Sequence, residues 1–207
     1  MTLIIKNREV VEDDWLVIAT NPAGGLPLPD ALPAGKVIVP LAYWKDAGET
    51  LRGLRDKSEL GIWLAPDDEP AEVVPEFDAV ALLAVDFPVF RDGRSMSTAR
   101  LLRERYGWKG EIRAIGDVQR DQIGYMARCG IDVFAVRADK DIHDALKAFD
   151  ELTLHYQGAV DDPRPLFRQV DRTPAAQSAT NSSANVDAND ATNSAVGSTS
   201  GFADAQR

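Results

Sequence analysis

Short apolar segments alternate with segments of helical periodicity through the middle of the chain. Five apolar segments have the near-continuous hydrophobic character of strands covered on both faces, and they lie at residues 36–41, 61–65, 79–87, 110–117 and 131–137. Most are followed by a segment whose apolar residues recur at helical spacing, although a proline-broken acidic stretch follows the second. Parallel strands require a long crossover connection, which is usually a helix. The alternation therefore predicts an α/β fold built on a parallel sheet of about five strands with crossover helices.

The alternation does not determine how the sheet is wound. A full barrel of eight strand–helix units typically needs about 250 residues, whereas the chain has 207. The sequence therefore favours either an open doubly wound sheet or a half-barrel. Residues 1–20 add a small hairpin pattern, with Asn7 near its turn, and a short strand after it.

Two changes in composition divide the chain. Residues 21–35 form a loop rich in proline and glycine. Residues 172–207 are polar, with too few large apolar side chains to offset the entropy lost on ordering. We therefore expect an N-terminal hairpin and strand at 1–20, an α/β domain at 36–158 and a disordered C-terminal tail at 172–207.

Charge and composition exclude several classes of function. The net charge of −10 argues against non-specific binding to nucleic acid or to an anionic membrane surface. No segment approaches the roughly 18 consecutive apolar residues of a membrane span, and the N-terminal segment does not have the pattern of a signal peptide. We therefore expect a cytoplasmic protein that binds neither nucleic acid nor membranes.

Residues 86–104, DFPVFRDGRSMSTARLLRE, gather many groups that bind anions at the start of one predicted helix. In a parallel α/β sheet, ligands bind beyond the carboxyl ends of the strands. There Arg91 and Arg94 can bind an anion in bidentate fashion, and Ser95 and Ser97 add hydroxyls beside the N–H groups of the first helical turn. This pattern predicts a site for a small oxyanion or for an anionic group on a partner. The alternative is structural: Ser95 caps the helix, and the arginines pair with nearby acids.

Three further charged residues are candidates for chemistry. Asp86 and Asp117 lie at the carboxyl ends of predicted strands, where they can act as general acid and base or hold Mg²⁺. Acids at such positions also commonly cap helices, and that alternative stays open. Arg113 lies inside an otherwise apolar strand, so it either faces solvent at an edge or is buried with an acidic partner, for which Asp86 is a candidate.

No residue pattern identifies a cofactor or a metal. The chain contains no G-x-G-x-x-G, no Walker A lysine loop and no C-x-x-C, so it carries no sequence signature for NAD, flavin, haem or iron–sulfur. Its single cysteine, Cys129, excludes an internal disulfide and any cysteine-only metal or iron–sulfur site built from this chain alone. We interpret Cys129 as a small core residue, and a redox role is disfavoured because no second cysteine can resolve a disulfide.

The segment at residues 87–134, FPVFRDGRSMSTARLLRERYGWKGEIRAIGDVQRDQIGYMARCGIDVF, resembles an uncharacterised bacterial domain family. Members of that family are labelled as oxidoreductases involved in sulfite reduction, and their genes usually lie beside that of the sulfite/nitrite reductase haemoprotein. The resemblance covers about residues 30–155. It implies a place in assimilatory sulfate reduction and the reductase haemoprotein as a partner, but it supplies no catalytic residues.

The chemistry of the pathway limits what this chain can do in it. Six-electron reduction of sulfite needs a haem-type centre and an iron–sulfur cluster, and the chain lacks the thiolates for a cluster. We therefore expect an accessory protein that acts with the reductase. The alternatives are a small α/β enzyme, in which Arg91, Arg94 and Arg113 bind an anionic metabolite, and an interaction module without a ligand. The sequence leaves open whether the chain is catalytic.

Overall fold

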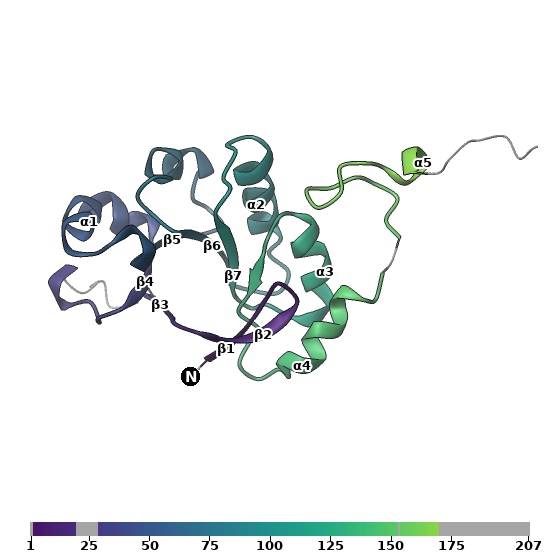
Figure 1. Ribbon diagram of the computed structural model, residues 1–207, viewed down its shortest axis with the longest axis horizontal. Coiled ribbons are helices and arrows are strands. Elements are labelled where there is room, and N and C mark those ends of the chain that lie inside the picture. The colour runs from purple at the N-terminus through teal and green to yellow at the C-terminus, as the bar shows by residue number, and fades with distance from the viewer. Residues whose placement is uncertain (1, 20–28, 153, 170–207) are drawn as a thin grey trace, which may run out of the picture. The chain divides into compact units, whose positions relative to one another are not determined.

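The computed structural model describes residues 2–19, 29–152 and 154–169 (Figure 1). The chain divides into two units, Met1–Asp171 and Arg172–Arg207, and all described residues belong to the first. The tail predicted at 172–207 lies outside the described residues, as does the first part of the loop predicted at 21–35.

The described residues form one mixed sheet of eight strands, in the order β2-β1-β8-β7-β6-β5-β4-β3. The strands are β1 (Thr2–Lys6), β2 (Glu9–Asp13), β3 (Trp15–Val17), β4 (Lys36–Pro40), β5 (Leu60–Leu64), β6 (Leu82–Phe87), β7 (Glu111–Gly116) and β8 (Val133–Phe134). Strands β3 to β8 are parallel, and each pairs with the next in chain order. Strand β1 is antiparallel to both β2 and β8.

Helical segments connect the parallel strands. The α-helices are α1 (Leu41–Leu54), α2 (Arg94–Glu104), α3 (Arg120–Arg128), α4 (Ile142–Ala145) and α5 (Leu166–Gln169). The 3₁₀ helices are η1 (Pro29–Ala31), η2 (Lys57–Glu59), η3 (Pro70–Glu76) and η4 (Leu146–Phe149). None of the helices in these described ranges is long and apolar enough to cross a membrane.

The strand order decides between the two predicted windings. A doubly wound sheet reverses its strand order at a switch point, but β3 to β8 follow one another without a reversal. Because successive crossovers are right-handed, they place their helices on the same face of the sheet. The sheet accordingly curls into an open half-barrel with the helices on its convex side (Figure 1).

The sheet differs from the prediction in size and in direction. It has eight strands rather than about five, and it is partly antiparallel. The N-terminal hairpin causes the antiparallel part, because β1 pairs with β8 through Ile5–Phe134 and Lys6–Val133. This pairing covers the backbone of a strand edge that would otherwise be exposed.

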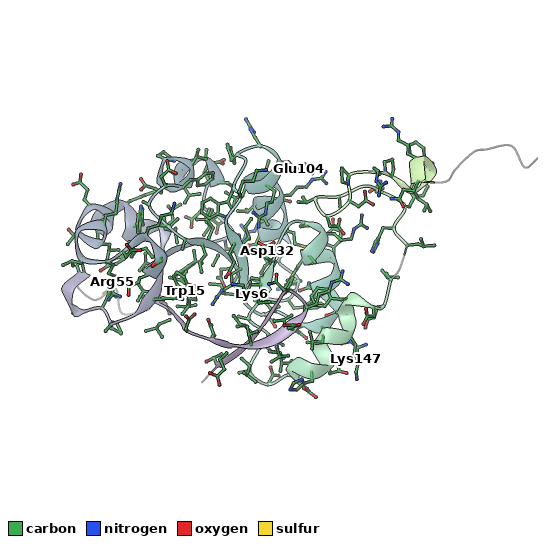
Figure 2. The ribbon with its side chains drawn as sticks, viewed as in Figure 1. Lys6, Trp15, Arg55, Glu104, Asp132 and Lys147 are labelled. Carbon is green, nitrogen blue, oxygen red and sulfur yellow. The ribbon has the colours of Figure 1, made fainter. Side chains whose placement is uncertain are left out.

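Strands β2 and β3 lie at opposite ends of the strand order, yet only Asp14 separates them in the sequence. Residues 9–17 therefore act as one long extended segment, which pairs with β1 along its first half and with β4 along its second (Figure 1). Trp15, the first residue of β3, is labelled in Figure 2. A pairing of this kind is possible only if the sheet is strongly curled.

The two faces of the sheet carry separate apolar clusters. Leu83, Val85 and Phe87 of β6 pack in the large cluster beneath the helices. Leu82 and Ala84, which alternate with them, belong to a smaller cluster on the concave face. Side chains along a strand point alternately to its two faces, so Asp86 also belongs to the concave face.

Candidate functional site

The carboxyl ends of the parallel strands form a rim on which several predicted site residues lie. Asp86 is the last but one residue of β6, and Asp117 directly follows β7. Between β6 and α2 the chain forms a loop, residues 88–93, which we call the rim loop. Hydrogen bonds between the rim loop and the residues that follow β7 determine how the side chains on the rim are arranged.

Asp117 is an acceptor that organises the rim. Its carboxylate accepts hydrogen bonds from Gln119 Nε2 (2.8 Å), the backbone N–H of Phe90 (2.9 Å) and Arg137 Nη1 (2.8 Å). The Gln119 amide, followed by the Phe90 N–H and the Arg137 guanidinium, holds the pKa of Asp117 below its usual value. Asp117 is therefore ionised at neutral pH and ties the rim loop to the end of β7. It does not cap α3, whose N-terminal flanking residue is Gln119.

Asp86 lies in a different environment. It is half-buried, and burial raises the pKa of its carboxyl, with a further increase from the nearby Asp92 carboxylate. Gly116, which pairs with Phe87 in the β6–β7 ladder, has φ +91°, and a Cβ there would be 2.6 Å from Asp86 Oδ1 and would clash with the carbonyl oxygen of Phe87. Of the two rim acids, only Asp86 has the raised pKa expected of a general acid.

Arg94 is committed to internal ion pairs. Its guanidinium donates to both carboxylate oxygens of Asp92 (3.0 and 2.7 Å) and also pairs with Asp67. The hydrogen bonds to these acids raise the pKa of Arg94, with Asp92 contributing most. This pairing corresponds to the structural alternative for the arginine rather than to an open anion site.

The two predicted serines lie in different environments on α2. Helix α2 begins at Arg94 after Gly93, so Ser95 lies inside the first turn instead of capping it. The buried Ser95 hydroxyl donates to the backbone carbonyl of Asp86. Ser97 is exposed on α2. Arg91 is also exposed, and it makes no ion pair or hydrogen bond with any other residue that the structure describes.

Arg113 is separated from the rim. Its side chain is 2% exposed, and its guanidinium donates to Asp13 Oδ1 (2.8 Å) and Glu111 Oε1 (3.2 Å). Ala84, not Asp86, is its partner in the β6–β7 ladder. Asp86 is therefore not the partner of Arg113, which pairs with Glu111 of its own strand and with Asp13 of the N-terminal hairpin, 100 residues away.

Cys129 is a buried free cysteine just after α3. Burial raises the pKa of its thiol, which reduces the thiolate that nucleophilic or redox chemistry requires. Within residues 2–19, 29–152 and 154–169, no three His, Cys, Asp or Glu side chains are grouped as metal ligands.

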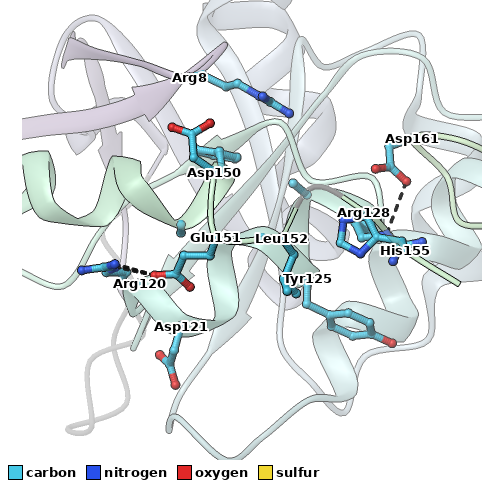
Figure 3. A pocket seen from close by; sticks show the side chains of 14 residues that line it. Arg8, Arg120, Asp121, Tyr125, Arg128, Asp150, Glu151, Leu152, His155 and Asp161 are labelled. Carbon is cyan, nitrogen blue, oxygen red and sulfur yellow. Dashed lines mark hydrogen bonds and ion pairs between the residues drawn. The ribbon is translucent and has the colours of Figure 1, made fainter.

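A cavity of about 650 Å³ lies away from the rim, between α3 and the segment that follows η4 (Figure 3). Its charged lining residues have both signs and comprise Arg8, Arg120, Asp121, Arg128, Asp150, Glu151 and Asp161. Several are already paired: Arg120 binds Glu151, and Arg128 Nε lies 3.7 Å from Asp161. Three arginines against four acids give this cavity no preference for an anion.

Sequence reasoning missed this cavity because its walls come from distant segments. The hairpin contributes Arg8, whose guanidinium lies 5.3 Å from the centre of the Phe149 ring. Helix α3 and residues 148–161 contribute the rest. No local spacing connects these segments, and none of the predicted site residues lines the cavity.

Comparison with known proteins identifies a family for this chain. The model of a family described as "Bacterial protein of unknown function (DUF934)" matches residues 61–167, just over half of the chain. The matched range runs from β5 through the rim loop, both rim acids and Cys129. Neither the curated proteins nor the solved structures provide a match.

Proposed function

We propose that this chain, which belongs to the bacterial family of unknown function that its sequence matches, is an accessory protein of assimilatory sulfite reduction. In this proposal it docks on the sulfite reductase haemoprotein, which carries the redox centres. The resemblance of residues 87–134 supports the choice of pathway, and the arrangement of charged groups supports docking over catalysis.

The observation that carries the docking function is that two of the three candidate arginines, Arg94 and Arg113, pair with acids of the chain itself. Arg94 pairs with acids of its own loop and of the β5–η3 connection, and Arg113 pairs with acids on β2 and β7. Arg137, which lies three residues after β8, also pairs with acids, Asp117 and Asp139. An enzyme that binds an anionic substrate through arginines needs guanidinium groups free to receive it, and these three are already neutralised.

An excess of acidic side chains at residues 66–78 supports docking to a basic partner. Residues 66–78 contain six acidic and no basic side chains: Asp67, Asp68, Glu69, Glu72, Glu76 and Asp78. Three of them form ion pairs with Lys45, Arg52 or Arg94, while Glu69 and Asp78 are exposed. Such a surface attracts a basic patch on a partner and accelerates association at low ionic strength.

The test is a deletion strain: the gene is removed from a bacterium that naturally carries it, and growth of the deletion strain is compared with that of the parent. On sulfate or sulfite as the only sulfur source, the deletion strain is expected to grow poorly, and cysteine should restore growth. Normal growth on sulfate would overturn the proposal. Poor growth on sulfate with normal growth on sulfite would also contradict it, because the defect would then lie before the reductase.

One observation favours a second candidate, a small α/β enzyme acting on an anionic metabolite. Asp86 combines partial burial, a raised pKa and a position on the concave rim. Arg91 is the rim-loop arginine without a partner in the described chain and would have to bind the anion. Calorimetric titration with sulfite, sulfate and phosphate at low salt tests this candidate. Heat of binding that disappears in Arg91→Ala would support it, and the absence of heat with all three anions would exclude it.

A further inference from the structure

The rim loop presents a short apolar segment to solvent. Val89 and Phe90 are 47% and 40% exposed, and Pro88 and Arg91 on either side are exposed as well. Aromatic residues such as phenylalanine, and arginine, are both enriched at protein interfaces. We call residues 88–91 the rim-loop tip.

The backbone of the tip is held in place from both sides. The Phe90 N–H donates to Asp117 Oδ2 (2.9 Å), and the Phe90 carbonyl accepts from Gln122 Nε2 (2.7 Å). The Asp92 N–H also donates to the Val89 carbonyl (3.0 Å). A segment that is already ordered before binding loses less conformational entropy on association. Asp117, after β7, and Gln122, on α3, therefore fix a loop tip whose apolar side chains are exposed.

The local charges indicate what the tip fits. The Asp92 carboxylate of the rim loop is paired with Arg94. Arg91 therefore remains a cation without a partner in the described part of the chain. A partner surface that receives the tip should therefore combine an apolar pocket for Phe90 with carboxylates facing Arg91.

From these observations we infer that the rim-loop tip is the anchor by which this protein docks, with Phe90 inserted into an apolar pocket of a partner protein bordered by acidic side chains. The inference rests on the proposed docking function and names the contacting residues. It is compatible with the acidic surface at residues 66–78, because overall charge governs the rate of encounter whereas a buried anchor governs the lifetime of the complex.

The experiment measures binding of the full chain to the purified sulfite reductase haemoprotein by calorimetry. Phe90→Ala is expected to raise Kd at least tenfold, and Arg91→Glu should weaken binding in the same direction. Leu54→Ala is the matched control, because Leu54 is an even more exposed apolar residue (55%) at the end of α1, and the change should leave Kd unchanged. Far-ultraviolet circular dichroism confirms that each variant is folded. Because Arg91 makes no hydrogen bond or ion pair with other described residues, its variant remains informative if Phe90→Ala is unstable.

The outcomes separate the two proposals. If the wild-type chain binds and both tip variants bind as tightly, the tip inference is overturned and the docking function stands. If the wild-type chain does not bind the haemoprotein, both are overturned. Self-association of the free chain that Phe90→Ala abolishes would also overturn the inference, because the occupant would then be a second copy of this chain.

Discussion

Asp86 and Asp117 end neighbouring strands of one sheet, yet their surroundings drive their pKa values in opposite directions. Asp117 accepts three hydrogen bonds, which stabilise its charged form. Asp86 is half-buried close to another carboxylate, which destabilises its charged form. Two acids at similar positions relative to their strands therefore have pKa values shifted in opposite directions. Of the two, only Asp86, with its raised pKa, makes the free energy of unfolding decrease as pH rises.

The change Asp86→Asn tests this difference. A raised pKa means that the folded state binds the Asp86 proton more tightly than the unfolded state. Its contribution to the free energy of unfolding is therefore complete below the ordinary carboxyl pKa of about 4 and is lost as pH rises through the raised value. The variant lacks this loss, so its stability relative to the wild type should increase between acidic and neutral pH. Urea unfolding across that range measures it, and parallel pH profiles would contradict the assignment.

Gly116 is a second residue whose role can be measured. Its left-handed φ of +91° and the nearby Phe87 carbonyl leave no space for a Cβ. Gly116→Ala should lower the free energy of unfolding by more than about 2 kcal/mol, since the left-handed conformation alone costs an alanine about 1–2 kcal/mol. Gly53 on α1 has open space around it, so Gly53→Ala should raise the free energy of unfolding by up to about 1 kcal/mol. Equal effects in urea unfolding would refute this account of Gly116.

At the level of elements, the extended segment at residues 9–17 joins the two edges of the sheet, and ion pairs attach it to the strands. Arg113 on β7 binds Asp13 on the concave face, and Lys36 on β4 binds Asp14 (2.6 Å). Lys6 of β1, labelled in Figure 2, binds the Glu111 carboxylate at 2.7 Å. The Arg113–Asp13 pair is buried, whereas the two lysine pairs are partly exposed. We expect the buried pair to contribute most to holding the hairpin.

Removing one partner of the buried pair should be costly. Arg113→Ala leaves Asp13 buried without its guanidinium, and the expected loss is about 3–5 kcal/mol of unfolding free energy. Arg100→Ala is the control, because it breaks an exposed pair with Glu104 worth less than about 1 kcal/mol. Urea unfolding of both variants makes the comparison. A loss in Arg113→Ala no larger than that in Arg100→Ala would show that the pair does not hold the hairpin.

The central strands could be predicted from sequence, and the edges could not. Strands β4 to β7 are near-continuous apolar runs, so their pattern is local. Strand β8 has two residues, and its pairing with Ile5 and Lys6 of β1 joins segments more than 120 residues apart. Nothing in either segment alone indicates that the hairpin completes the main sheet.

The same distinction applies to the candidate site. Positions after apolar runs correctly indicated which residues lie at the carboxyl ends of the strands, including Asp86 and Asp117. The sequence offered Asp86 as the candidate partner of Arg113. The observed partner Asp13 could not be identified, because its position beside Arg113 depends on how the hairpin joins the sheet. The exposed tip at Val89 and Phe90 also depends on folded geometry, since apolar residues after a strand are equally compatible with burial.

At the scale of the whole molecule, the proposed function depends on one physical claim: this protein works by contact with a partner. Its charged rim residues are largely neutralised within the chain, and its net charge of −10 favours encounter with a basic surface. Attraction between exposed charges is screened by salt, with a Debye length of about 10 Å at 0.1 M. Association driven in part by charge should therefore weaken as ionic strength rises.

Sedimentation velocity of the purified sulfite reductase haemoprotein, followed at the visible absorbance of its haem, tests this claim most directly. We predict that adding the full chain at low ionic strength makes the haem boundary sediment faster, and that high ionic strength reduces the shift. A haem boundary that sediments at the same rate with and without the chain at low ionic strength would contradict the account.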